Sequence, residues 1–219
     1  LSARLFHFKI TSFAQMKVIE VQKPGGLDHL NITSRPDPSP RPGELLVQWH
    51  ATSLNYHDYL VATGGIPVFG KRVPMSDGAG EVLAVGEKVS NWKVGDRVMS
   101  MFFPLWIEGK PTLPKMMAIM GETVDGCMME KACVSASAVT AIPEGYSFAE
   151  AATLPCAALT AWRGLMEEGN LKAGESVLIE GTGGMSILAL QLAKAAGARV
   201  FATTSSPEKA ERLLAMGVE

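Results

Sequence analysis

Residues 175–186, Glu-Ser-Val-Leu-Ile-Glu-Gly-Thr-Gly-Gly-Met-Ser, are the stretch that decides the fold of this chain. Residues 175–180 form an apolar run typical of a buried strand, and a glycine-rich turn follows it. Residues 185–196 then have the composition of a helix, which Gly197 ends. A strand that passes through a glycine-rich turn into a helix predicts the start of an α/β unit.

The sequence beyond this helix continues the alternation of strand and helix. Residues 199–203 are typical of a second strand, and Ser206 caps a further helix in which Pro207 occupies the first position. This order indicates a parallel, doubly wound sheet. Two strands cannot bury both faces of such a sheet, so we expect residues 147–219 to form an incomplete domain with uncovered apolar surface.

The glycine-rich turn has the pattern of a dinucleotide phosphate loop. Gly181 permits the tight turn, Gly183 lets backbone approach a pyrophosphate, and the small Ser186 allows close packing of helix on strand. The helix N-terminus adds free N–H groups and a partial positive charge. The alternative is a tight turn without a ligand. The predicted cofactor-binding residues of this loop are Gly181, Thr182, Gly183, Gly184, Met185 and Ser186.

The end of the second strand indicates which dinucleotide is preferred. A carboxylate about 20 residues after the first glycine would hold the ribose 2′-hydroxyl of NAD, and none stands at the strand end itself. Thr204, Ser205 and Lys209 offer hydroxyls and a cation that suit a 2′-phosphate, which favours NADP(H). Glu208 argues against that preference. Alternatively, Lys209 is only a solvated residue of the first helical turn.

The preceding part of the chain, from residue 16 to about residue 140, is rich in predicted strands. The runs at residues 45–49, 80–85 and 96–101 are separated by turns rich in glycine, proline, asparagine and aspartate. Several short strands with regular turns predict a compact β-barrel or sandwich. Ser147 and Glu150 then have the spacing of a capping box, which begins an alanine-rich helix interrupted at Pro155 and ended by Gly169.

Composition excludes several classes of function. The net charge is −2 and the pI is about 6.1, so we expect neither a nucleic-acid partner nor an anionic membrane partner. No apolar run approaches the about 20 residues of a membrane span. Three cysteines without a secretory signal favour the cytoplasm. Residues 1–15 contain basic residues and no acid, which suits either an N-terminal extension or a mitochondrial targeting segment.

Three segments together resemble the medium-chain dehydrogenase/reductase family. They are residues 73–98, with Ser-Asp-Gly-Ala-Gly at residues 76–80, residues 151–162, and the phosphate loop. The variants of these motifs are similar to a zinc-independent, alcohol-dehydrogenase-like branch near the quinone reductases. The resemblance implies a GroES-like β-barrel catalytic domain at residues 16–146, followed by an incomplete Rossmann domain at residues 147–219.

The resemblance also bears on zinc. Zinc-dependent relatives use two cysteines and a histidine around a catalytic zinc with an open fourth position. The corresponding positions here are Asn55, Ser76 and Cys156, and neither Asn55 nor Ser76 replaces a zinc ligand well. The four-cysteine lobe of such relatives is also missing, because residues 90–126 contain no cysteine. We therefore expect no metal.

Without zinc, the hydride chemistry belongs mostly to the nicotinamide. The resemblance places the segment Asn55 to Tyr59 in the cleft beneath that ring. Asn55 is expected to bind a carbonyl oxygen, Tyr56 (or Tyr59) to donate a proton or hydrogen bond, and Asp58 to orient a neighbour. Packing at the domain interface is the alternative role of both tyrosines.

Two further features are assigned by the same resemblance. Thr160 lies at a helix position that approaches the nicotinamide in relatives, although its hydroxyl alternatively bonds to its own preceding turn. The apolar run at residues 101–106 is expected either to cover the substrate cleft or to pack in the barrel.

The resulting expectation is an NADP(H)-dependent oxidoreductase that acts on a carbonyl, quinone or enone. The chain ends soon after the second helix of the Rossmann unit, so the alternative is a truncated, catalytically inactive member with partial cofactor binding or an interaction role. Members of the family are usually homodimers, and the dimer-forming segment is expected to be absent here. We expect a small-molecule substrate as the partner.

Overall fold

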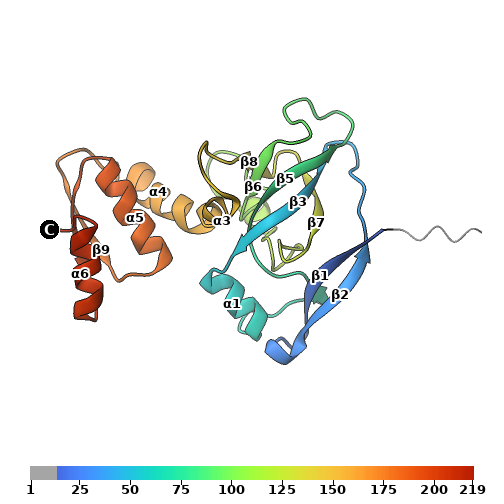
Figure 1. Cartoon of the computed structure of the whole chain (residues 1–219), viewed down its shortest axis with the longest axis horizontal. Coiled ribbons are helices and arrows are strands. Elements are labelled where there is room, and N and C mark those ends of the chain that lie inside the picture. The colour runs from blue at the N-terminus through green and yellow to red at the C-terminus, as the bar shows by residue number, and fades with distance from the viewer. Residues whose placement is uncertain (1–13) are drawn as a thin grey trace, which may run out of the picture.

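The computed structural model describes residues 14–219, and the expected N-terminal extension, residues 1–15, lies almost wholly outside this range (Figure 1). A part built mainly of β-strands carries the first two thirds of the chain, and a part with two longer helices and two parallel strands follows. Short helical segments join them and pack on the larger sheet (Figure 1). Within the described residues, no helix is long and apolar enough to cross a membrane.

The larger sheet is antiparallel, with the strand order β7-β3-β5-β6-β8. Along β3, Leu45, Val47 and Trp49 occupy alternate positions and point into the core, as the period of two requires. Gly80 lies opposite Trp49, and a Cβ there would meet the carbonyl oxygen of Gln48 at 2.0 Å. The strands are β3 (Glu44–Ser53), β5 (Asp77–Val85), β6 (Arg97–Ser100), β7 (Lys131–Ser135) and β8 (Val139–Ala141).

A second, three-stranded sheet has the order β2-β1-β4 and lies beside the first (Figure 1). Arg35 on its outer strand forms ion pairs with the buried Glu20, at 2.8 Å, and with Asp125, at 2.6 Å. The pair with Glu20 lies within the small sheet, and the pair with Asp125 fastens that sheet to the loop that precedes β7. The elements are β1 (Gln15–Gln22), β2 (Leu30–Pro36), β4 (Lys71–Arg72), the 3₁₀ turn η1 (Leu27–His29), and the helices α1 (Tyr56–Thr63) and α2 (Leu113–Met116).

The connecting helical stretch begins at the predicted capping box. The hydroxyl of Ser147 accepts the backbone N–H of Glu150 at 3.2 Å, and the Glu150 carboxylate accepts the Ser147 N–H at 2.8 Å. The interruption expected at Pro155 is a widening into π-helical turns, because proline has no N–H for the usual bond. The segments are α3 (Phe148–Ala151), η2 (Leu154–Ala158), α4 (Leu159–Trp162) and η3 (Arg163–Glu168), and Gly169 caps the last.

The last part is the predicted strand–helix–strand–helix unit. Its elements are β9 (Ser176–Glu180), α5 (Gly184–Ala195), β10 (Arg199–Thr203) and α6 (Pro207–Ala215), and the two strands are parallel. Helix α5 buries Leu190 and Ala193 against one face of the strands. On the strands, Leu178 and Phe201 are paired in register and are 63% and 37% exposed. The expected fold class is confirmed, and the uncovered apolar surface lies on the sheet.

Candidate active site

The phosphate loop has the backbone geometry that its glycines predict. Gly181 has a φ of 75°, a left-handed conformation that favours glycine, and its N–H donates to the carbonyl of Thr203 at 3.2 Å. Gly183 is the N-cap residue of α5. A Cβ at Gly183 or Gly184 would meet no protein atom within 4 Å. Internal packing therefore does not explain these two glycines, and the open space before the helix suits the backbone approach of a phosphate.

The remaining loop residues hold the helix to the strand. Ser186 donates its hydroxyl to the carbonyl of Glu180 at 2.9 Å, which ties the first turn of α5 to the end of β9. Thr182 is half-buried, and Met185 is exposed at the mouth of the loop. Ser186 thus contributes a specific hydrogen bond in addition to the small size that its position requires.

The residues predicted to select NADP(H) follow β10. The Thr204 hydroxyl is buried and has no hydrogen-bond partner, whereas Ser205 and Lys209 are exposed. Ser206 caps α6 by accepting the backbone N–H of Lys209 at 3.3 Å, as predicted. The Glu208 carboxylate is 2.9 Å from Arg212 on the next turn. The acidic group that argued against a 2′-phosphate is therefore already paired within its own helix.

A buried polar cluster lies where α1 begins. Asp58 is 1% exposed, and its carboxylate accepts the backbone N–H groups of Asn55 and Ser76, each at 2.8 Å. The Asn55 amide donates to the Ser76 hydroxyl at 3.2 Å. Asn55 is the N-cap residue of α1 and Asp58 its third residue, so a local capping box places both groups. The Asp58 carboxylate thus lies against Asn55 and Ser76, and its role in orienting a neighbour stays a prediction.

Asp77 connects this cluster to the helical connector. It is fully buried and accepts the Ser76 hydroxyl at 3.0 Å and the backbone N–H of Cys156 at 2.9 Å. Burial raises the pKa of Asp77 to about 6, although hydrogen bonds from its neighbours oppose the shift. The Asp77 carboxyl therefore titrates closer to neutral pH than an exposed aspartate does.

Hydrogen bonds link the three positions that the resemblance assigned to zinc ligands. The Asn55 amide donates to the Ser76 hydroxyl, and the Ser76 hydroxyl and the Cys156 N–H both donate to Asp77. The donors do not fit a catalytic zinc, because the amide of Asn55 and the hydroxyl of Ser76 bond to each other. Burial, together with nearby carboxylates, raises the pKa of the Cys156 thiol to about 12, which opposes a thiolate. Among residues 14–219, no group of three or more His, Cys, Asp or Glu side chains is placed to hold a metal.

His57 and Glu122 form a pair beside the buried polar cluster, and the sequence did not predict this pair. The Nε2 atom of His57 lies 2.8 Å from the Glu122 carboxylate, and Nδ1 lies 3.6 Å from Asp58. The carboxylate of Asp58, followed by that of Glu122, raises the pKa of His57 against the opposing effect of burial. His57 was visible beside Asp58 in the sequence, but Glu122 is 65 residues away and only the fold joins them.

The two tyrosines of α1 lie outside this buried cluster. Tyr56 is 74% exposed and Tyr59 is 50% exposed, and their rings stack with centroids 5.9 Å apart. The backbone N–H of Tyr59 donates to the carbonyl of Asn55, as helix geometry requires. Both hydroxyls are thus open to a ligand and are not part of the Asn55–Ser76–Asp77 network.

An apolar cavity of about 650 Å³ adjoins the cluster. One wall is formed by residues 101–107, which contain the run at residues 101–106 predicted either to cover the cleft or to pack in the barrel, and the other is the connector between Pro155 and Glu167. Thr160 lines it, and its hydroxyl donates to the carbonyl of Cys156 at 2.7 Å, the alternative foreseen for this residue. Cys156 also lines the cavity, so it borders both the apolar space and the polar cluster.

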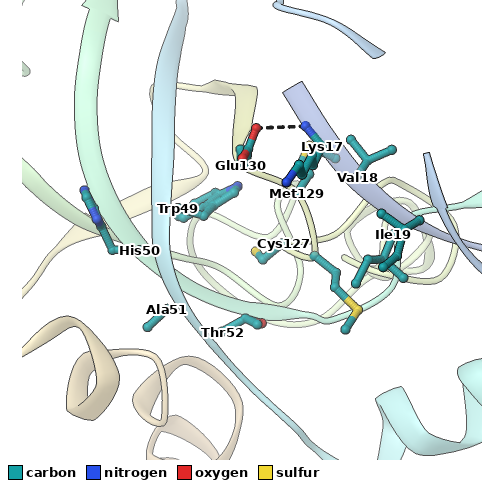
Figure 2. A pocket seen from close by; sticks show the side chains of 12 residues that line it. Lys17, Val18, Ile19, Trp49, His50, Ala51, Thr52, Cys127, Met129 and Glu130 are labelled. Carbon is teal, nitrogen blue, oxygen red and sulfur yellow. Dashed lines mark hydrogen bonds between the residues drawn. The ribbon is translucent and has the colours of Figure 1, made fainter. Parts of the chain in front are cut away.

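A second hollow, of about 390 Å³, opens between β1, β3 and residues 127–130. Figure 2 shows Trp49 and Cys127 among the side chains that line it, with Met129 beside Lys17, whose backbone N–H donates to the Glu130 carboxylate. Complete burial raises the pKa of the Cys127 thiol, so this cysteine is an inert core residue. The hollow contains none of the residues predicted for the site.

Comparison with known proteins agrees with this architecture. Residues 41–144 match the alcohol dehydrogenase GroES-like domain family. A zinc-type alcohol dehydrogenase-like protein of Schizosaccharomyces pombe is 43% identical over 94% of this chain and 57% of its own length. A solved candidate alcohol dehydrogenase of Sinorhizobium meliloti 1021 is 38% identical, with a TM-score of 0.86 over 93% of this chain and 61% of that chain. The quinone oxidoreductase of Coxiella burnetii is 30% identical, with a TM-score of 0.73 over 94% of this chain and 61% of that chain.

A GroES-like β-domain followed by the first strands and helices of a Rossmann domain defines an alcohol-dehydrogenase-like architecture. The chain belongs to the medium-chain dehydrogenase/reductase superfamily. It spans 57% of the length of the Schizosaccharomyces pombe relative and 61% of each of the two solved structures.

Proposed function

We propose that this protein is a zinc-independent, NADP(H)-dependent oxidoreductase that acts on a carbonyl, quinone or enone. The observation that carries the proposal is the position of Cys156, which lines the apolar cavity and donates its backbone N–H to the buried polar cluster. An apolar cavity with a few convergent polar groups is the usual form of a small-molecule site. Similarity to an alcohol dehydrogenase-like protein and a quinone oxidoreductase supports this class of reaction.

A bound nicotinamide supplies the hydride in this chemistry. The roles of the protein are to bind the substrate oxygen and to provide a proton. Asn55 is the proposed ligand of the carbonyl oxygen, and Asp58 positions it through the hydrogen bond to its backbone N–H. Tyr56 is the proposed proton donor, since its hydroxyl is exposed beside the start of the same helix. Thr160 keeps free lone pairs on its hydroxyl oxygen, which suits a hydrogen bond from a cofactor amide.

Support for NADP(H) over NAD(H) comes from the surroundings of β10. The unpartnered Thr204 hydroxyl and the exposed Ser205 and Lys209 offer donors to a 2′-phosphate. Pairing of Glu208 with Arg212 reduces the negative charge that would oppose it. Support for zinc independence comes from the donors at the corresponding positions, which are an amide, a hydroxyl and a half-buried thiol whose pKa is raised. Cytoplasmic location remains part of the proposal, on the three free cysteines.

A second candidate function is cofactor binding or partner binding without catalysis. The exposure of Leu178 and Phe201 favours it, because this pair leaves one face of the parallel strands uncovered. A chain that presents such a face either binds another protein there or holds the cofactor weakly.

A fluorescence titration of the 219-residue chain with NADPH and, separately, NADH tests the proposal. Saturable binding that favours NADPH, followed by NADPH oxidation in the presence of an aldehyde, an enone or a quinone, is the expected result. Binding without oxidation of NADPH by any of the three would favour the second candidate. Absence of binding to either nucleotide would contradict both the cofactor assignment and the catalytic proposal.

A further inference from the structure

One wall of the 650 Å³ cavity is a continuous series of aromatic rings. Phe102 and Phe103 meet edge to face with centroids 4.8 Å apart, and Phe103 is 5.9 Å from Trp106. Trp106 is fixed at its polar end, because its indole N–H donates to the carbonyl of Gly109 at 2.9 Å. The rings therefore form an ordered wall of π-surface.

The opposite wall comes from the helical connector and is unusually exposed. Leu159 is 59% exposed and Trp162 is 47% exposed, although both line the cavity. The guanidinium of Arg163 lies 5.4 Å from the ring centroid of Trp106 and so links the two walls. The Arg163 guanidinium also forms an ion pair with the Glu168 carboxylate, with 2.5 Å between nitrogen and oxygen. The cavity therefore has aromatic side chains on both walls, with Trp162 on the connector side. At one edge the Arg163 guanidinium lies over the ring of Trp106 and joins the two walls.

The shape and chemistry of these walls favour a flat ligand. Aromatic side chains gain about 0.5–1.5 kcal/mol from stacked or edge-to-face partners beyond the area that they bury. A saturated, puckered ligand of the same carbon skeleton gains only the free energy of burying its apolar surface, without the contribution from aromatic pairing. A short aliphatic carbonyl would leave most of the apolar surface of Leu159 and Trp162 exposed to water.

We propose that this cavity binds the planar, conjugated ring of an aryl ketone, aryl enone or quinone, and that Trp106 is a specificity-determining residue. The proposal rests on the function proposed above and narrows its substrate class. The ring lies against the wall formed by Phe102, Phe103 and Trp106, and the carbonyl end points toward Cys156 and the polar cluster beyond it. Arg163 covers the outer edge by its contact with Trp106.

Isothermal titration of the 219-residue chain with acetylnaphthalene and with its fully saturated decalin analogue tests the proposal. Acetylnaphthalene is an aryl ketone that does not alkylate thiols, so the free cysteines do not react with it. We expect the aryl ketone to bind about tenfold more tightly than the saturated analogue. The Trp106→Leu variant should lose roughly two- to tenfold in affinity for the aryl ketone and little for the analogue.

Two variants control for folding and for the ring itself. Trp106→Phe keeps an aromatic face and should retain most of the preference for the aryl ketone. Leu105→Ala alters an exposed neighbour that does not line this cavity and should leave both affinities unchanged. Equal binding of the two ketones to the unmodified chain would overturn the proposal without any variant. The proposal would also be overturned if Trp106→Leu weakened the binding of both ketones by the same factor.

Failure of the narrower inference is distinguishable from failure of the proposed function. NADPH oxidation with short aldehydes, together with no preference for the aryl ketone, would overturn the inference and leave the oxidoreductase function standing. Preferential binding of acetylnaphthalene without NADPH oxidation would support the ring site and contradict catalysis by this chain.

Discussion

The backbone N–H of Cys156 donates a hydrogen bond to the Asp77 carboxylate, 2.9 Å away, although 79 residues separate them in the chain. A second hydrogen bond between the same two parts is donated by the Ser53 hydroxyl to the carbonyl of Ala152, at 2.7 Å. These two bonds fasten the β-part to the first turns of the connector. The orientation of the cavity wall therefore depends on a buried carboxyl whose pKa is raised to about 6.

Removing the charge of Asp77 should change how stability depends on pH. The folded-state pKa of about 6 lies above the ordinary 3.8, so the folded chain holds this proton more tightly than the unfolded chain. The resulting stabilisation is complete below about pH 4 and is lost as the pH rises through about 6. Relative to Asp77→Asn, the unmodified chain should lose on the order of 2 kcal/mol of unfolding free energy across that window, measured by urea denaturation.

The variant Asp28→Asn removes a negative charge from an exposed position and serves as the control for net charge. A constant difference in unfolding free energy between Asp77→Asn and the unmodified chain from pH 4 to 7 would contradict the assignment.

Replacing Glu122 by glutamine should lower the pKa of His57. The Glu122 carboxylate is 2.8 Å from Nε2 and favours the charged imidazole, although Asp58 contributes more. Titration of the imidazole Cε1 proton by NMR in the unmodified chain and in Glu122→Gln measures the change. We expect a downward shift, and Glu130→Gln, a carboxylate that pairs with the backbone of Lys17, should cause none. An unchanged pKa in Glu122→Gln would show that the pair is not formed in solution.

Removing the Tyr56 hydroxyl tests the proposed proton donor. Loss of a general acid typically costs about a hundredfold or more in turnover, so Tyr56→Phe should lower kcat strongly and leave KM almost unchanged. Tyr59→Phe is a matched control, because it removes a hydroxyl from the ring stacked on Tyr56. Steady-state oxidation of NADPH with a ketone substrate measures both. Equal kcat values for Tyr56→Phe and Tyr59→Phe would remove Tyr56 from the mechanism.

Replacing Lys209 by alanine should weaken NADPH binding and not NADH binding. A charge-assisted contact to a 2′-phosphate is worth about 1 kcal/mol at an exposed site, which corresponds to roughly a fivefold change in Kd. Thr204→Val removes the unpartnered hydroxyl at constant shape and should act in the same direction. Fluorescence titration with both nucleotides measures the ratio, with Lys110→Ala as the control at a distant exposed lysine. A parallel loss of NADH affinity would indicate a structural effect.

The local elements followed closely from the sequence. The Ser147–Glu150 capping box, the Ser206 cap with Pro207 behind it, and the turn at Gly181 all depend on neighbours within a few residues. Such contacts are set by side-chain chemistry and by backbone preference, which can be read along the chain. The interruption at Pro155 was also visible, but its form as π-helical turns was not.

The sequence by itself determined the order of elements, the glycine-rich turn between strand and helix, and the family, because those features have a local spacing or a recognisable motif. Only the tertiary structure decided that Asn55 reaches Ser76, that Cys156 reaches Asp77 and that Glu122 reaches His57. It also decided that the run at residues 101–107 faces the connector across an apolar cavity. These relationships join residues far apart in the chain, and their geometry depends on how the whole barrel packs against the helices.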